Sequence, residues 1–203
     1  MSGKRAPRRS RSARSTTATW AWIGGGVVVA VIVAMLAAGG RGGGFEPSPP
    51  GSVTIDQARE GPLAAGEVVP AFSAPAIDGS TVRWTGRPER PTVLAVWASW
   101  CPHCQAELPR LAAALDRHPG VDLVTVVTAI GQRPGPTPPE YLASEGLSFP
   151  VAVDDASGTL ARGLGVQGFP TVYYVGADGR VVGVTVGEVD AAQLEAILEA
   201  LEA

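Results

Sequence analysis

The chain has 203 residues and a formal net charge of −3, which leaves room for one domain with extensions. It holds only two cysteines and two histidines, and His103 lies between the cysteines, so a zinc site with about four ligands is disfavoured. Six of the 16 Lys and Arg fall in the first fourteen residues, which contain no Asp or Glu. A basic arm of this kind is compatible with nucleic-acid binding, but the segment that follows indicates a membrane instead.

That segment runs from Trp20 to Ala38, is apolar, and lies within a stretch without any charged residue. Nineteen helical residues span about 28 Å, close to the thickness of a hydrocarbon core. The cations before the segment place the N-terminus in the cytoplasm. We therefore predict a basic cytoplasmic tail over residues 1–19 and a single-pass signal-anchor helix over residues 20–38. A cleaved signal peptide is the alternative, but the apolar run is long for one, and Leu36-Ala37-Ala38 is a weak cleavage site.

Residues 39–62 are rich in Gly, Pro and Ser, so they are predicted to form a flexible linker. A domain is expected over residues 63–203, outside the cytoplasm. Its first elements are two strand-like runs, Phe72–Ala76 and Thr81–Trp84, which flank Asp78-Gly79 and so indicate a β-hairpin.

The next run, Thr92–Trp97, is continuously apolar, as in a buried central strand. A helix is expected to follow, because Cys101, Cys104 and the leucines after them recur at steps of three and four residues. Pro102 suits the first turn of this helix, and the helix is expected to reach about His118. The two cysteines, spaced as Cys-x-x-Cys, thus lie where a strand passes into a helix.

After this helix the chain alternates between strand and helix patterns. Four strands are expected, at Val121–Thr128, Val151–Val153, Thr171–Val175 and Val181–Val186. Thr137, Asp155 and Asp190 are expected to cap three helices, the second of which runs from Ala156 to Leu164.

The cysteine spacing in a strand–helix setting is the signature of a redox-active dithiol. Cys101 lies at the helix N-terminus, where the dipole favours a thiolate, so it is the expected nucleophile and should be exposed. Cys104 lies one turn further on, in the stripe that faces the core, and is the expected resolving thiol. A structural disulfide, a zinc site and two inert core cysteines are the competing interpretations.

The stretch from Trp97 to Cys104, Trp-Ala-Ser-Trp-Cys-Pro-His-Cys, resembles the active site of the membrane-anchored TlpA/ResA/DsbE-like thiol–disulfide oxidoreductases. This resemblance implies an α/β thioredoxin fold over residues 63–203. Such a fold has a central mixed sheet flanked by helices, here with an N-terminal β-hairpin extension and one preceding transmembrane helix. The order of the predicted elements agrees with it.

Further positions match the same family. Glu107 matches the active-site glutamate of the ResA-like branch, and Gly168-Phe169-Pro170-Thr171 matches the loop whose cis-proline, here Pro170, faces the cysteines. Two positions depart from thioredoxin itself: Ala95 stands where thioredoxin has a buried Asp, and the dipeptide is Pro102-His103, as in DsbA-type oxidants.

These residues have distinct expected roles. A half-buried Glu107 would exchange protons with Cys104. Pro102 and His103 would tune the redox potential, the latter by favouring the Cys101 thiolate. Backbone groups of the 168–171 loop would pair with a client chain, and Trp100 would flank the site. Glu107 and His103 can also be read as solvated surface residues.

The resemblance implies a protein that exchanges its Cys101–Cys104 couple with client cysteines, as a reductant in cytochrome c maturation or a related pathway. The Pro-His dipeptide leaves open a DsbA-like oxidant, and a non-catalytic tethered binding module is the alternative of another class. The expected partners are client proteins with thiols or disulfides and a membrane electron donor or acceptor. No nucleic acid, no metal and no cofactor beyond the cysteine couple is expected.

Overall fold

Two β-sheets and four helices make up the part of the chain that the computed structural model describes, residues 52–56, 59 and 61–203, all within one structural unit. The strands are β1 (Thr54–Ile55), β2 (Phe72–Pro75), β3 (Thr81–Trp84), β4 (Thr92–Trp97), β5 (Asp122–Val127), β6 (Val151–Val153), β7 (Thr171–Val175) and β8 (Val181–Val186). The helices are α2 (Pro102–Leu115), α3 (Pro138–Glu145), α4 (Thr159–Gly163) and α5 (Ala191–Glu202).

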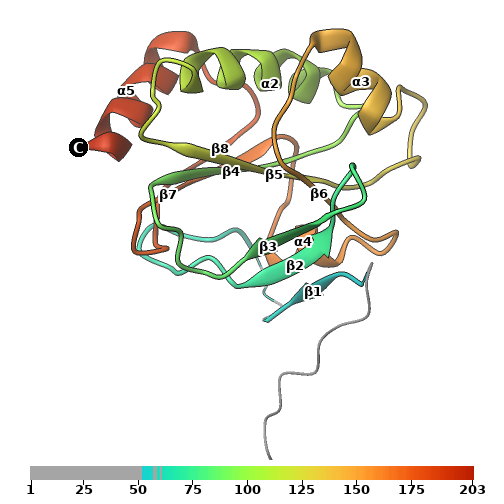
Figure 1. Ribbon diagram of the computed structural model, residues 1–203, viewed down its shortest axis with the longest axis horizontal. Helices are drawn as coiled ribbons and strands as arrows, with labels where there is room; N and C mark the ends of the chain where they lie inside the picture. The colour runs from blue at the N-terminus through green and yellow to red at the C-terminus, as the bar shows by residue number, and fades with distance from the viewer. Residues whose placement is uncertain (1–51, 57–58, 60) are drawn as a thin grey trace, which may run out of the picture. The chain divides into compact units, whose positions relative to one another are not determined.

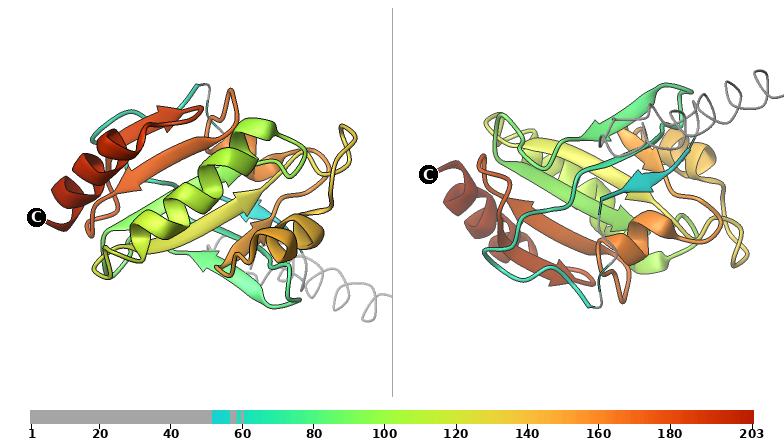
Figure 2. Two further views of the ribbon diagram at one scale, coloured as in Figure 1. Left: turned by 90° about the horizontal axis from the view of Figure 1, so that it is seen from above. Right: turned by 90° about the horizontal axis from the view of Figure 1, so that it is seen from below.

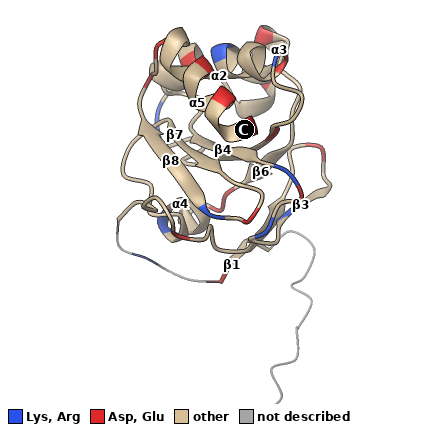
Figure 3. Ribbon diagram, turned by 90° about the vertical axis from the view of Figure 1, so that its left-hand side faces the viewer, with Lys and Arg blue, Asp and Glu red and all other residues tan. Residues whose placement is uncertain are grey.

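The central sheet is mixed, with the strand order β6-β5-β4-β7-β8. β4, β5 and β6 run parallel, whereas β7 pairs antiparallel with both β4 and β8. All six residues of β4 are buried, because this strand has neighbours on both edges and cover on both faces. Charged residues lie mainly on helices and loops, and the ribbon of the central sheet is almost free of them (Figure 3).

Helices α2, α3 and α5 cover one face of this sheet, and the small sheet β1-β2-β3 lies on the other face together with α4 (Figure 1; Figure 2 shows the two faces separately). Two buried clusters hold the layers together. Val93, Tyr174, Leu111 and Leu198 pack between the sheet and the helices α2 and α5. Leu94, Tyr173, Phe72 and Leu160 pack on the opposite face. The strand that leads into Cys101 is therefore fixed from both sides.

The predicted hairpin is confirmed by β2 and β3, which pair through Phe72 and Trp84 at one end. The folded unit, however, begins earlier than the expected boundary at Leu63. Residues 54 and 55, assigned to the linker from composition, form β1 and pair with β2. The side chain of Ile55 packs against the core beneath α4, so it has an apolar reason to be ordered that the Gly- and Pro-rich composition hides.

Two helix boundaries differ from the prediction. α2 ends at Leu115, and the chain to His118 continues as turns in which N–H groups bond three residues back. α4 begins at Thr159 rather than at residue 156. The carboxylate of Asp155 accepts the Ser157 N–H at 2.9 Å and so forms a turn first. It also accepts the N–H of Thr159 at 3.1 Å, as a cap should, and Asp154 accepts the N–H of Leu160 at 2.8 Å.

The predicted tail over residues 1–19 and the predicted anchor over residues 20–38 lie outside the described residues, as does most of the linker. Among the helices that are described, none is both long and apolar enough to cross a bilayer.

Candidate active site

The two cysteines lie where β4 passes into α2. Cys101 is the N-cap of α2, with φ −87° and ψ 115°, and Pro102 occupies the first turn, as predicted. The N–H of Cys104 donates to the Cys101 sulfur at 3.4 Å, so the two cysteines are in direct contact. Neither sulfur is in a disulfide, so this is the dithiol form.

The two thiols differ less in exposure than the sequence suggests. Cys104 is fully buried, but Cys101, expected to be exposed, is itself only 5% exposed. The reason is that Cys101 belongs to an apolar cluster with Trp97 and Leu108, against which Trp100 and Phe169 also pack. Burial raises the pKa of the Cys104 thiol, and a backbone hydrogen bond offsets only part of this effect. Cys104 therefore remains a protonated thiol at neutral pH.

The loop that precedes β7 closes over Cys101. Its Phe169–Pro170 peptide bond is cis, as the resemblance implies. The Cys101 thiol donates to the carbonyl oxygen of Phe169 at 3.7 Å, across 68 residues of sequence. The Thr171 hydroxyl donates to the Gly168 carbonyl at 2.7 Å, and the Pro170 carbonyl accepts the Gly187 N–H at 2.8 Å. The predicted loop residues are thus assembled beside the nucleophile.

Trp100 forms a wall of the site. Its indole N–H donates to the Ala129 carbonyl at 2.7 Å, and its ring meets Phe169 edge to face at 6.0 Å between centroids. Ala129 has φ 54°, a left-handed conformation that is unfavourable for a residue with a side chain. Gly135 also lies against Trp100, so closely that a Cβ atom at position 135 would be 2.7 Å from the Trp100 Cβ. The loop after β5 thus holds Trp100 beside the cysteines.

Glu107 is buried more deeply than predicted, with 1% exposure rather than half-burial, so it is not a solvated surface residue. One carboxylate oxygen, Oε2, accepts the Val189 N–H at 3.3 Å and contacts Arg110 at 3.0 Å. The other oxygen, Oε1, is buried without a hydrogen-bond partner among the described residues. Burial raises the pKa of Glu107, and the negative charge of Glu188 raises it further. The Val189 N–H and Arg110 offset part of this increase.

His103 lies on the outside of the helix turn, with 68% of its side chain exposed. Its Nδ1 is 2.7 Å from Oε1 of Glu188, in the β8–α5 connection. The other oxygen of Glu188 accepts from Arg110 at 2.5 Å. The hydrogen bond formed by the His103 ring is therefore to Glu188 and not to the Cys101 sulfur.

The site is thus a buried Cys-x-x-Cys pair on a strand–helix turn, faced by a cis-proline loop. A family model, Redoxin, matches residues 64–200 of the chain. This chain belongs to the Redoxin family. It is 29% identical over 130 residues to sporulation thiol-disulfide oxidoreductase A of Bacillus subtilis, covering 63% of this chain and 78% of that protein. It is 30% identical over 128 residues to the thiol:disulfide interchange protein DsbE of Pseudomonas aeruginosa, covering 62% and 68%.

The fold of this Redoxin-family chain is similar to a solved thiol:disulfide interchange protein of the thioredoxin family from Chlorobium tepidum TLS. The TM-score is 0.56 at 24% identity, with 72% of this chain and 99% of that chain covered. The protein is a thiol–disulfide oxidoreductase with a thioredoxin-like α/β fold and a mixed central sheet. The resemblance inferred from the cysteine motif is confirmed.

The Redoxin domain also contains polar site residues that sequence reasoning missed. Arg110 lies three residues after Glu107 on the same helix, a spacing that favours an ion pair and that could have been noticed. Glu188 and Val189 come from the other end of the chain, and no local pattern points to them. The hydroxyl of Tyr141 donates to the Gln105 carbonyl at 3.1 Å, and burial, with smaller contributions from Glu145 and Cys104, raises the pKa of Tyr141 to about 12.

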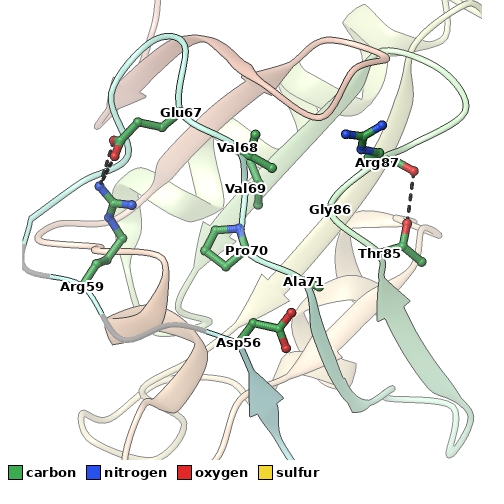
Figure 4. A pocket seen from close by; sticks show the side chains of 10 residues that line it. All are labelled: Asp56, Arg59, Glu67, Val68, Val69, Pro70, Ala71, Thr85, Gly86 and Arg87. Carbon is green, nitrogen blue, oxygen red and sulfur yellow. Dashed lines mark hydrogen bonds and ion pairs between the residues drawn. The ribbon is translucent and has the colours of Figure 1, made fainter. Parts of the chain in front are cut away.

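A separate cavity of about 470 Å³ lies on the hairpin side of the domain, away from this site (Figure 4). Arg59 and Glu67 form an ion pair at 2.8 Å on one side of it, and Arg87 lies on the other side. Neither cysteine nor any residue of the cis-proline loop lines it. No cluster of three or more His, Cys, Asp or Glu suited to a metal ion occurs within the described part of the chain.

Proposed function

We propose that this oxidoreductase reduces disulfides of client proteins outside the cytoplasm, in cytochrome c maturation or a related pathway. The Cys101 thiolate attacks a client disulfide, forming a mixed disulfide and releasing one client thiolate, which takes up a proton. Cys104 then attacks the Cys101 sulfur, releases the second client thiol and leaves the Cys101–Cys104 disulfide. Two electrons and two protons pass from the dithiol to the client, and a membrane electron donor restores the dithiol without a bound cofactor.

The observation that carries the reducing direction is the set of groups around the Cys101 sulfur. A dithiol becomes a strong oxidant in its disulfide form when the reduced thiolate is specially stabilised, often by a nearby cation. The Cys101 sulfur hydrogen-bonds to two backbone groups, the Cys104 N–H and the Phe169 carbonyl. Among the described residues, no Lys, Arg or His side chain hydrogen-bonds to it. Its surroundings therefore favour a readily oxidised dithiol.

We also propose that Glu107 exchanges a proton with Cys104 during this cycle. The thiol and the carboxyl lie one helical turn apart, and burial raises the pKa of both. A buried thiol must lose its proton before it can attack the mixed disulfide, and water has little access to it. The buried carboxyl, with one oxygen not committed to a hydrogen bond among the described residues, is a suitable acceptor.

The proposed location is the outer face of a cell membrane, with a single N-terminal span and a cytoplasmic N-terminus. The uncharged apolar run of residues 20–38 and the basic head support it. Full-length protein should remain in the membrane fraction after carbonate extraction. A soluble mature form beginning near Gly39 would contradict the anchor and leave the thiol chemistry untouched.

The direction of transfer is tested by the midpoint potential of the full-length protein, equilibrated with glutathione or dithiothreitol at pH 7. We expect a value nearer to the roughly −270 mV of thioredoxin than to the roughly −120 mV of DsbA. A potential near the upper value would identify an oxidant that introduces disulfides into exported proteins, as the Pro-His dipeptide suggests. Absence of any exchange with a model disulfide would favour a binding module.

A further inference from the structure

The Glu188 side chain contacts α2 at two residues, His103 and Arg110, which lie before and after the buried Glu107 in the helix. The residue belongs to the connection between β8 and α5, far from the cysteines in sequence. One oxygen is 2.7 Å from His103 in the Cys-x-x-Cys turn, and the other is 2.5 Å from Arg110, two turns later. The next residue, Val189, donates its N–H to Glu107. This short connection therefore contacts the dipeptide and the buried acid together.

Arg110 is shared between two carboxylates. Its Nη2 atom lies 2.5 Å from Glu188 and 3.0 Å from Glu107. A guanidinium that pairs with two anions stabilises each less than it would stabilise one alone. The two carboxylates also repel each other, since like charges at short range disfavour double ionisation.

The two acids differ in their access to solvent. Glu107 is 1% exposed, whereas the side chains of Glu188 and Arg110 are 37% and 39% exposed. Hydrogen bonds from His103 and Arg110 lower the pKa of Glu188, so it is ionised at neutral pH. A solvent-accessible group that is ionised at neutral pH is thus linked through one cation to a buried group with a raised pKa.

We infer that Glu188 is a positioning residue for the dithiol site, which holds Arg110 between two carboxylates and thereby keeps Glu107 able to take up a proton. The charged or titratable groups that bear on Glu107 are Arg110 on α2, Glu188 in the connection, Tyr174 on β7 and, through Glu188, His103. The inference rests on the proposed proton exchange by Glu107, and it assigns control of that exchange to a residue outside the Cys-x-x-Cys turn.

Two substitutions should act in opposite directions. Glu188→Gln removes a negative charge and leaves Arg110 with Glu107 as its one carboxylate partner within the described part of the chain, so the Glu107 pKa should fall. Arg110→Gln removes the cation, so the same pKa should rise. Glu188→Asp keeps the charge and should retain behaviour close to that of the wild type. Loosened packing alone would not produce opposite shifts.

The test is a pH titration of the Glu107 carboxyl carbon by NMR on full-length, ¹³C-labelled protein, combined with the pH profile of disulfide exchange. We expect opposite shifts of the Glu107 titration in the Gln variants. At the pH where the wild-type rate is half-maximal, the exchange rates should change by roughly two- to fivefold, the range of a partly exposed ion pair. Glu195→Gln is the matched control, since Glu195 pairs with Arg117 in the turns that follow α2 and has no hydrogen bond or ion pair with Glu107 among the described contacts.

An unchanged Glu107 titration in Glu188→Gln would overturn the inference, as would shifts of the same sign in both Gln variants. These outcomes are separable from failure of the proposed function. If Glu107→Gln had the same exchange profile as the wild type, the proton-exchange proposal would fail, while the NMR titration of Glu107 would still report whether Glu188 controls its pKa.

Discussion

The two ends of α2 are both tied to the last segment of the chain by charged side chains, but the two ties differ in kind. At the C-terminal end, both ring nitrogens of His118 are paired, with Glu202 at 2.8 Å and Glu195 at 3.0 Å. At the end nearer the cysteines, Glu107 is buried, and one of its oxygens has no partner among the described residues.

This difference separates a stabilising cluster from a functional one. Buried polar groups are nearly always hydrogen-bonded, and one left unsatisfied costs about 1–3 kcal/mol. Both ring nitrogens of His118 have hydrogen-bond partners, whereas one oxygen of Glu107 has none among the described residues. The free-energy cost of the unpaired group therefore falls beside the cysteines, where the chemistry takes place. The following substitutions test whether the two clusters have these separate roles.

The largest expected effect comes from the cysteines. Cys101→Ser should abolish disulfide exchange, because the attacking sulfur is lost. Cys104→Ser should instead accumulate mixed disulfides with clients, since nothing resolves them. Non-reducing electrophoresis of full-length protein trapped with acid distinguishes the two results. If Cys101→Ser were the variant that trapped clients, the nucleophile and the resolving thiol would be exchanged in this account.

Glu107→Gln should slow exchange by about tenfold or more, the low side of general acid–base effects of about 10²–10⁴. Its free energy of unfolding should stay the same or rise, since a buried carboxyl is replaced by a neutral amide. Stopped-flow exchange kinetics and urea denaturation measure the two quantities. A variant that lost stability but kept its exchange rate would reverse the roles of the two clusters.

His118→Gln should have the opposite profile, with lowered stability and unchanged exchange. Hydrogen bonds to Glu202 and then Glu195 raise the pKa of His118 in the folded state. The stabilisation is therefore fully present below the unfolded-state value, roughly 6.5, and is lost as pH rises through the higher folded-state pKa. Urea denaturation from pH 5 to pH 9 should show the wild-type advantage shrinking with rising pH. A constant or growing advantage would contradict this assignment.

Much of the fold follows from local patterns. The apolar run of β4, the helical spacing after Cys101 and the Asp78-Gly79 turn of the hairpin each identify an element without help from distant residues. β1 was missed because two residues paired through tertiary contacts carry no pattern of their own. The start of α4 was placed too early because a turn through Gly158 follows Asp155, so the Asp155 carboxylate meets the helix at the Thr159 N–H rather than at residue 156.

The site could be predicted only where it lies on one helix or in one recognisable loop. Cys101, Cys104 and Glu107 share α2, and Pro170 was found through the resemblance. The burial of Cys101 depends on Phe169, which lies 68 residues away, and so could not be read from the motif. Glu188 and Val189 reach Glu107 only because the β8–α5 connection crosses the start of α2, a juxtaposition set by the topology of the whole sheet.

The midpoint potential as a function of pH tests the proposed proton exchange between Cys104 and Glu107 most directly. A two-electron, two-proton couple without other titrating groups changes by about 59 mV per pH unit. Measured from pH 5 to pH 9, the full-length wild type should depart from this slope over the range where Glu107 titrates, and Glu107→Gln should lack that departure. Superimposable curves for the two proteins would show that Glu107 takes no part in the proton transfer.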